Sequence, residues 1–421
     1  IKVMFLFSQQ SKVQDPSRGS MSSFIKRFRN ATLVAFNRTV YFLQDDDSAW
    51  SYEMDADKES VPFEKGRPRK YFDADSDSDE EQQNGDEPGT GKNNGGGDTV
   101  KKDQDDQTNA IVALDVNEDR SQVAVATGDK SLYLFEVDQD GRTLKVLSRR
   151  LLSRASSCVK FAAGGRFAIV CDKGGDCYRY DCEEYRKPGR WLLGHMSQVL
   201  DVLIDAEEKL IITSDRDEKI RVTCHPDCHN IETFCLGHTE FVSHLEFLGP
   251  ESLLSLSGDK TLRWWNYKSG KELARQELEL PGNKLALQKL AADGTGLLAV
   301  LCYKPTAVNV FKLSGTTGCE FVQALNLKSG QVFSTIAFDE SGNLLGLVIE
   351  ESTGAPSLAK YEFDRENSKL AKEAAIVKSF DDSKLPYVDS VSFLFKKKFD
   401  NIKDYQERKR KRIEENNKQL G

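Results

Sequence analysis

Short apolar segments separated by polar turns recur along most of the chain. From Thr108 onward each apolar run spans a few residues, alternates with polar positions and ends in a turn rich in Gly, Asp or Asn. Such runs predict β-strands rather than helices. The segments "LLGHMSQVLDVLI" and "CLGHTEFVSHLEF" share a Gly-His pair before an alternating strand. Their histidines, His195 and His238, have the spacing of roughly 40–45 residues that is typical of WD repeats.

The units that follow these two strands also repeat. Each continues with an apolar strand, a turn at an Asp and another strand, as in "KLIITSDRDEKIRV" and "SLLSLSGDKTLRWW", and weaker copies lie on both sides. Together with the strand-rich start, they predict an all-β fold, a seven-bladed WD-repeat β-propeller with about four strands in each blade. We expect the ring to close by pairing Thr32–Leu43 with strands near Tyr387–Phe395 in one blade, which would protect the terminal edges.

Composition divides the chain into further segments. Residues 55–107 are rich in Asp, Gly, Asn and Ser, a composition that predicts a disordered acidic insertion in the propeller. The propeller then comprises residues 21–54 and 108–395. Residues 396–421 predict a basic C-terminal helical tail, with Phe399, Ile402 and Tyr405 at helical spacing. Residues 1–20 are interpreted as a possible non-native extension, because Met21 resembles a natural start.

Charge and cysteine usage limit the class of protein. The net charge is -8, but the acids concentrate between Asp45 and Asp106, so the rest of the chain carries a slight excess of bases that could approach a polyanion. Nine cysteines are scattered without a disulfide framework, which favours an intracellular protein with reduced thiols. No apolar run approaches the roughly 18 residues of a membrane helix, so we expect a soluble protein without a membrane partner.

The two Gly-His histidines invite a catalytic interpretation, but their place in the repeat favours a structural one. In WD repeats such a histidine pairs with the Asp of the following turn, and a buried pair of this kind must be fully hydrogen-bonded. By alignment, seven residues form two networks: His195, Asp217 and Thr213 in one, and His238, Asp259, Ser255 and Trp265 in the other.

Motifs for catalysis and metal binding are not evident in the sequence. The chain contains no P-loop, no nucleophile elbow around a serine and no HExxH. The segment "CHPDCHN", Cys224–Asn230, places two Cys and two His too close together for a tetrahedral zinc site, so we expect no metal. We therefore interpret the chain as non-catalytic and without its own cofactor.

The turn "DRDEKIR" is unusually charged for a WD repeat. Lys219 stands where the next copy has Thr261, and Arg221 follows two residues later, a spacing that puts both on one side of a strand. Lys173, in the turn "CDKGGD" one unit earlier, could extend this group. Cations fixed on a rigid turn suit an acidic patch on a partner. The alternative is a set of solvated charges beside the acids of the same turn.

A family resemblance rests on longer stretches. "TSDRDEKIRV", "IETFCLGHTEFVS", "LLSLSGDKTLRWWNYKSGKEL" and "FDNIKDYQERKRKR" resemble the WD-repeat non-catalytic subunits of the tRNA guanine-7 methyltransferase, the wuho family. The resemblance is strong from about Trp191 to Leu273. It implies a heterodimer in which a separate Rossmann-type subunit binds S-adenosylmethionine and carries the catalytic site. The propeller would stabilise that subunit and help position tRNA for 7-methylguanosine formation in the variable region.

The resemblance also implies sites. The catalytic subunit would dock at Lys219 and Arg221, with Lys173 as a neighbour. The basic tail supplies candidates for RNA contact, namely Lys396, Lys397, Lys398, Lys403, Arg408, Arg410 and Arg412. The run Arg408–Arg412 is also typical of a nuclear address, which places the protein in the nucleus, with the cytoplasm as a further location. The alternatives are a generic nuclear WD-repeat scaffold, such as a ubiquitin-ligase adaptor or chromatin factor, and an enzyme acting by itself.

Overall fold

The computed structural model of the 421-residue chain describes most of its length. The described residues are 23–28, 31–44, 48–54, 63–64, 110–138, 143–289, 295–315, 317–364, 367, 369–371, 374–380, 385, 389, 391–396, 406–410 and 412.

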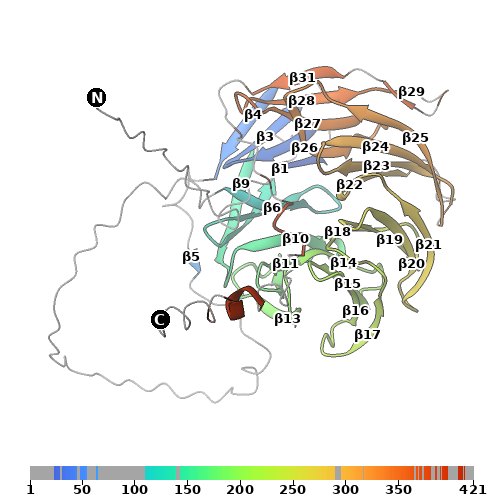
Figure 1. The fold of residues 1–421 in the computed structure, drawn as a ribbon. Helices are drawn as coiled ribbons and strands as arrows, with labels where there is room; N and C mark the ends of the chain where they lie inside the picture. Colours follow the sequence, from blue (N-terminus) through green and yellow to red (C-terminus); the bar gives the residue numbers. More distant parts are fainter. Residues whose placement is uncertain are drawn as a thin grey trace, which may run out of the picture.

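Within these residues, seven sheets of successive strands surround a central axis (Figure 1). Blade 1 contains β1 (Ser23–Phe28), β2 (Ala31–Phe36), β3 (Thr39–Gln44) and β4 (Ala49–Glu53). Blade 2 contains β6 (Ile111–Val116), β7 (Gln122–Thr127), β8 (Ser131–Val137) and β9 (Leu144–Leu151), with β5 (Phe63–Glu64) at its outer edge. Blade 3 contains β10 (Ser156–Ala162), β11 (Phe167–Asp172), β12 (Asp176–Asp181) and β13 (Arg190–Gly194). A short 3-10 helix, η3 (Ala163–Gly165), lies between β10 and β11.

The other four blades follow in chain order. Blade 4 contains β14 (Val199–Ile204), β15 (Leu210–Asp215), β16 (Ile220–Cys224) and β17 (Ile231–Cys235), and blade 5 contains β18 (Val242–Phe247), β19 (Ser252–Ser257), β20 (Thr261–Asn266) and β21 (Lys271–Glu277). Blade 6 contains β22 (Gly282–Lys289), β23 (Gly296–Cys302), β24 (Ala307–Leu313) and β25 (Cys319–Asn326). Blade 7 contains β26 (Gln331–Phe338), β27 (Leu344–Glu350), β28 (Pro356–Tyr361) and β31 (Ala375–Ser379). A two-stranded ribbon, β29 (Phe363–Asp364) and β30 (Lys369–Leu370), precedes β31. The predicted seven-bladed propeller is confirmed.

The position of a strand in its blade explains its sequence pattern. The second strands β2, β11, β19 and β23 are buried at every position, because both faces of each sheet pack against a neighbouring blade. Outer strands face solvent on at least one side, so β4 and β21 alternate between exposed and half-buried residues. The continuous apolar runs and the alternating runs in the sequence therefore mark inner and outer strands.

The core consists of apolar layers between successive blades, and its closure differs from the prediction. The first strand of each blade contacts the first strand of the next, and β26 contacts β1 to complete the ring. Val34 and Phe36 of blade 1 pack with Leu347 and Phe380 of blade 7. The predicted pairing of Thr32–Leu43 with strands near Tyr387–Phe395 is wrong, because β1 to β4 already fill blade 1. The ring closes by side-chain packing between two complete blades.

Several predicted segments fall wholly or partly outside the described residues. Residues 1–22 lie outside, and so does the acidic segment except for Phe63–Glu64, which pairs in parallel with Arg149 and Arg150 of β9. The domain boundaries proposed for these segments stay predictions. Near the C-terminus residues 406–410 and 412 are helical, whereas Phe399, Ile402 and Tyr405 lie outside the description. No helix among the described residues has both the length and the apolar character needed to cross a membrane.

Candidate functional site

The candidate residues lie on one face of the propeller. In a four-stranded antiparallel blade, the turn between the second and third strands and the loop to the next blade emerge at the same end. We call this end the top face. It carries residues 173–175 of blade 3, 216–219 of blade 4 and 258–260 of blade 5, with the connecting loops 195–198 and 236–241. The other end of the blades is the bottom face.

Blade 5 contains the full network that the repeat alignment predicts. His238 Nδ1 lies 2.9 Å from Asp259 Oδ2, and its Nε2 lies 2.7 Å from the Ser255 hydroxyl, which also accepts a 2.8 Å bond from Trp265 Nε1. Because a carboxylate accepts, Nδ1 carries the proton. Burial favours the neutral imidazole and lowers the pKa of His238, although Asp259 opposes this effect. The network stabilises the turn and leaves the histidine unsuited to exposed acid–base chemistry.

The carboxylate of Asp259 has several donors. It accepts hydrogen bonds from the backbone N–H of Thr239 and from both the N–H and hydroxyl of Thr261. Arg263 adds a contact of 3.6 Å. Burial by itself would raise the pKa of Asp259, but the hydrogen bonds from His238 and Thr261 lower it well below its usual range.

Blade 4 uses a different aspartate from the one predicted. His195 Nδ1 lies 2.9 Å from Asp215 Oδ2, and its Nε2 lies 2.7 Å from Thr213 Oγ1. The predicted partner, Asp217, is half-exposed in the turn, so the pairing of His195 with Asp217 is wrong. Asp215 is the last residue of β15, and its other oxygen accepts the backbone N–H of Lys219 at 2.9 Å. Sequence alignment fixes the backbone position of the two aspartates but not which side chain points inward.

The predicted cations of blade 4 have different environments. Lys219 is exposed and lies in the turn, one residue before β16 begins. Arg221 is half-buried and donates from Nη1 to the carbonyl oxygen of Gly194 at 3.0 Å. Burial lowers the pKa of Arg221. Of these two cations, Lys219 is therefore the one exposed to solvent, while Arg221 joins blade 4 to the end of blade 3.

Lys173 lies on the same face, one blade away. Its turn connects β11 and β12, and blades 3 and 4 are neighbours because β10 contacts β14. The side chain is half-buried, and burial lowers its pKa. The structure thus places Lys173 and Lys219 on equivalent turns of adjacent blades, as the sequence interpretation requires.

Asp389 and residues 391–396 contribute to the top face in a way that sequence reasoning missed. Val391 and Leu394 are buried against Phe241 of blade 5 and Tyr303 of blade 6. The Phe395 ring meets the Phe241 ring edge-on at 5.1 Å. The apolar run "VSFLF" belongs to the strands predicted near Tyr387–Phe395, but this prediction is wrong for Val391–Phe395, which forms turns across the top face.

Polar contacts hold both ends of this segment. Asp389 accepts hydrogen bonds from the Tyr303 hydroxyl at 2.7 Å and from Lys304 Nζ at 2.6 Å. Burial opposes ionisation, but these two donors prevail and lower the pKa of Asp389 to about 2. At the other end Lys396 forms an ion pair with Glu218, the neighbour of Lys219.

The basic candidates for RNA contact are only partly described. Arg408, Arg410 and Arg412 are exposed on the C-terminal helical residues, and Lys396 pairs with Glu218 as above. Lys397, Lys398 and Lys403 lie outside the described residues. Their part in RNA binding stays a prediction.

The "CHPDCHN" segment directs its side chains to different places. His225 Nδ1 lies 2.7 Å from the Glu208 carbonyl oxygen, and Cys228 is buried in the core between blades 3 and 4. Cys224 Sγ lies 3.7 Å from a carboxylate oxygen of Glu232. In the part of the chain that the structure describes, no three His, Cys, Asp or Glu side chains converge as a metal site would require.

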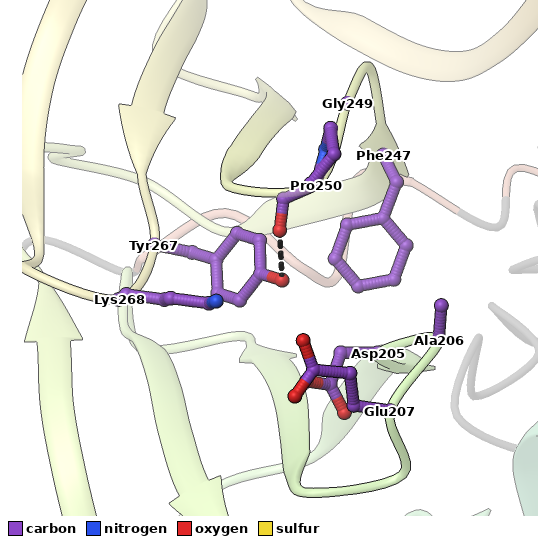
Figure 2. A pocket seen from close by; sticks show the side chains of 8 residues that line it. All are labelled: Asp205, Ala206, Glu207, Phe247, Gly249, Pro250, Tyr267 and Lys268. Carbon is purple, nitrogen blue, oxygen red and sulfur yellow. Dashed lines mark hydrogen bonds between the residues drawn. The ribbon is translucent and has the colours of Figure 1, made fainter.

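A cavity of about 280 Å³ lies on the bottom face, between blades 4 and 5. Figure 2 shows the rings of Tyr267 and Phe247 with the Asp205 and Glu207 carboxylates around it. The Tyr267 hydroxyl donates to the Pro250 carbonyl oxygen at 2.7 Å. This cavity lies at the opposite end of the blades from Lys173 and Lys219, so it is separate from the candidate site.

Comparison with known proteins identifies the family. The model of the tRNA methyltransferase TRM82 WD40 domain matches residues 37–189 and 181–357. The chain belongs to this family. A Culex quinquefasciatus protein, named the tRNA (guanine-N(7)-)-methyltransferase non-catalytic subunit wuho, is 96% identical over 95% of this chain and 100% of its own length. Its Aedes aegypti counterpart is 54% identical over 94% of this chain and 98% of its own length.

More distant relatives agree with this assignment. The Drosophila melanogaster protein of the same name is 36% identical over 72% of this chain and 74% of its own length. A chain from a crystal structure of the mitotic checkpoint complex aligns with a TM-score of 0.55 at 11% identity, covering 82% of this chain and 94% of its own; this likeness shows the fold alone. The predicted role as a non-catalytic subunit in this TRM82 WD40 family is confirmed.

Proposed function

We propose that this chain forms a heterodimer with a catalytic tRNA guanine-N7 methyltransferase subunit, which it stabilises and helps to position on tRNA. The names of the relatives imply such a catalytic partner. S-adenosylmethionine would bind to that partner, and 7-methylguanosine would form in the variable region of the tRNA. The chain described here would supply a rigid surface and no reacting group.

The observation that carries this proposal is the exposed Lys219 on a fixed turn. Its backbone N–H is held by Asp215, which is held in turn by His195, so the turn has little freedom to lose on binding. Lys173 presents a second amine from the same face of blade 3. An acidic surface on the catalytic subunit would be attracted and oriented by these charges. Arg221 would act indirectly, by fixing blade 4 against Gly194.

The proposed contact with tRNA involves the exposed C-terminal arginines. Arg408, Arg410 and Arg412 lie on short helical stretches and are exposed. Arginine guanidinium groups bind phosphate oxygens and release counterions from the RNA as they do so. Added salt reduces this gain, so the affinity for tRNA should fall as the salt concentration rises. We also propose that the run Arg408–Arg412 directs the protein to the nucleus. Imaging a fluorescent fusion with and without alanines in this run tests the localisation directly.

Co-purification with the catalytic subunit tests the central proposal. The two chains should co-elute, and the pair should form 7-methylguanosine on tRNA faster than either chain alone. Lys219→Glu should weaken the complex about tenfold or more, because it places a like charge against an acidic surface. Lys260→Glu is the matched control, since Lys260 is exposed in the equivalent turn of blade 5. Failure of the wild-type chain to bind or stimulate the partner would contradict the proposal.

A separate measurement tests the RNA contact. Replacing Arg408, Arg410 and Arg412 by alanine should reduce the affinity of the heterodimer for tRNA and flatten its dependence on salt concentration. The affinity of the two subunits for each other should stay the same. A tRNA affinity unchanged by the triple substitution would remove the C-terminal arginines from the model.

A further inference from the structure

Two large apolar side chains on the top face are exposed to an extent that the fold does not explain. The Met196 side chain is 98% exposed and Leu236 is 63% exposed. Both belong to loops between blades, Met196 between β13 and β14 and Leu236 between β17 and β18. Complete burial of either side chain would be favourable, but the isolated propeller leaves both exposed.

Leu236 and Lys219 leave the same end of two paired strands. In the antiparallel pairing of β16 with β17, Ile220 faces Cys235 and Arg221 faces Phe234. Lys219 and Leu236 are the next residues outward from the Ile220–Cys235 pair, so each lies one residue beyond the paired ends of β16 and β17. Phe234 continues this apolar edge, since its side chain is 36% exposed.

Met196 lies on the other side of the same turn. It follows His195, whose ring is bonded to Asp215 at the start of the turn. Two residues later the Gln198 carbonyl oxygen accepts the backbone N–H of Arg216 at 2.9 Å. The loop that carries Met196 is thus fixed to the turn of Lys219 by contacts at both ends.

The chemistry of this surface favours a folded protein over RNA. Asp217 and Glu218 lie in the turn itself, and Glu240 lies in the Leu236 loop, so a phosphate backbone would meet several carboxylates. Glu218 and Glu240 both bind Lys396, which leaves Lys219 as the exposed cation of its turn. Apolar side chains around one cation fit a partner with an apolar patch beside an acidic residue.

We propose that Met196 and Leu236 are the apolar contacts that bind the catalytic methyltransferase subunit, one on each side of Lys219. This inference rests on the proposed heterodimer and assigns most of its affinity to these two side chains. Lys219 then contributes mainly to orientation and association rate, as charged interface groups commonly do. Met196 suits such a role because an unbranched thioether adapts to the partner surface.

Affinity measurements with matched controls test this proposal. The complex of the full chain with the catalytic subunit is titrated by calorimetry, using Met196→Ala, Leu236→Ala and the double variant. Each single change should weaken binding about tenfold, and the double change more than either. Ile376→Ala and Phe321→Ala are the controls, because these side chains are 59% and 55% exposed on the outer strands of blades 7 and 6. Neither control should change the affinity more than about twofold.

Salt separates the apolar contacts from the cationic one. The loss caused by Lys219→Ala should shrink between 0.1 and 0.5 M salt, as screening removes the wild-type advantage (roughly 10 Å screening length at the lower concentration). The losses caused by Met196→Ala and Leu236→Ala should persist at both concentrations. Thermal unfolding of each variant checks that the propeller is intact. We expect unchanged unfolding, because the substituted side chains are exposed.

The outcomes distinguish this inference from the proposed function. If the wild-type chain does not bind the catalytic subunit, the proposed function itself fails. If the wild-type chain binds and both alanine variants bind equally well, the apolar contact is overturned while the heterodimer stands. If Met196→Ala and Leu236→Ala weaken tRNA binding but leave subunit affinity intact, the surface belongs to RNA and the inference is overturned.

Discussion

The turns of blades 4 and 5 have the same length and nearly the same place in the repeat, yet they direct their polar groups differently. In blade 5, Asp259 collects donors from His238, Thr239, Thr261 and Arg263. In blade 4, the residue that binds the histidine is Asp215, two positions earlier in the turn. Blade 5 therefore shows the repeat unit as a purely structural device, and blade 4 shows a variant of it in the turn that we propose faces a partner.

Two substitutions in blade 4 remove parts of the network that blade 5 contains. Lys219 replaces Thr261, so an exposed amine stands where blade 5 has a hydroxyl bonded to Asp259. Thr223 replaces Trp265, so the indole N–H that bonds Ser255 in blade 5 has no equivalent. A histidine–aspartate pair is still present, made by His195 with Asp215, and Asp215 also accepts the backbone N–H of Lys219 in the turn.

The largest effect should come from removing the central carboxylate of blade 5. Asp259→Ala should lower the free energy of unfolding by about 3 kcal/mol, because His238 and Arg263 lose their buried acceptor. Urea denaturation of the purified chain measures this change. Lys260→Ala, at the next residue, is the control and should shift stability by less than about 0.5 kcal/mol. Equal effects of the two substitutions would contradict the structural role given to Asp259.

The corresponding change in blade 4 should have a smaller effect and tests the corrected pairing. Asp215→Ala should cost about 2 kcal/mol, since Asp215 accepts from His195 and from the Lys219 backbone but has fewer donors than Asp259. Asp217→Ala should stay within about 0.5 kcal/mol. The same urea experiment compares both variants, and a larger cost for Asp217 would restore the pairing expected from sequence.

The contrast shows how far sequence reasoning reaches in this fold. Repeat spacing predicted the propeller and the His238–Asp259 pair, because both follow from backbone positions that recur with the repeat. Spacing could not choose between Asp215 and Asp217, since that depends on side-chain direction within a tight turn. Closure of the ring between β26 and β1 was missed for a similar reason: both strands mix apolar and polar residues, and nothing in their composition indicates which strand lies next to them.

The sequence predicted the charged turn of the candidate site but not its exposed apolar side chains. The charged turn was visible because Lys219 departs from the repeat, and the resemblance supplied the kind of partner. The exposure of Met196 and Leu236 had no sequence signal, because a single apolar residue in a loop is equally typical of a buried position. The packing of Val391 and Leu394 against Phe241 and Tyr303 joins distant parts of the chain, so no local sequence pattern predicts it.

A pH titration should show a moderate effect and compare the two histidines. Burial lowers the pKa of both His195 and His238, so the folded chain binds fewer protons than the unfolded chain below about pH 6.5. Stability should therefore be fully present above that pH and fall as the pH decreases from 6.5 toward 5. His244, whose burial lowers its pKa to about 4, adds a fall of the same sign.

The measurement is the urea midpoint of the wild-type chain at several pH values. Replacing His195 or His238 by glutamine should reduce the slope of stability against pH in this window, each by removing one titrating imidazole. His229→Gln is a control on an exposed position of the "CHPDCHN" segment. If neither glutamine substitution changes the slope of stability against pH, protonation of His195 and His238 does not contribute to the loss of stability.

The smallest effect concerns the ion pair between Lys396 and Glu218, which joins the end of the segment that lies on the top face to the turn of blade 4. Lys396 and Glu218 are both more than one third exposed, so solvent screens their ion pair. Lys396→Ala should change global stability by less than about 0.5 kcal/mol. The same substitution should speed hydrogen exchange at the Leu394 amide, which donates to the Val391 carbonyl oxygen at 2.9 Å. Lys187→Ala, which removes an exposed pair with Glu184 on blade 3, should leave that amide unchanged. If Lys396→Ala leaves it unchanged as well, the aromatic packing of Phe395 and the hydrogen bond from Arg216 Nε to the Leu394 carbonyl oxygen hold the segment without help from the Lys396–Glu218 pair.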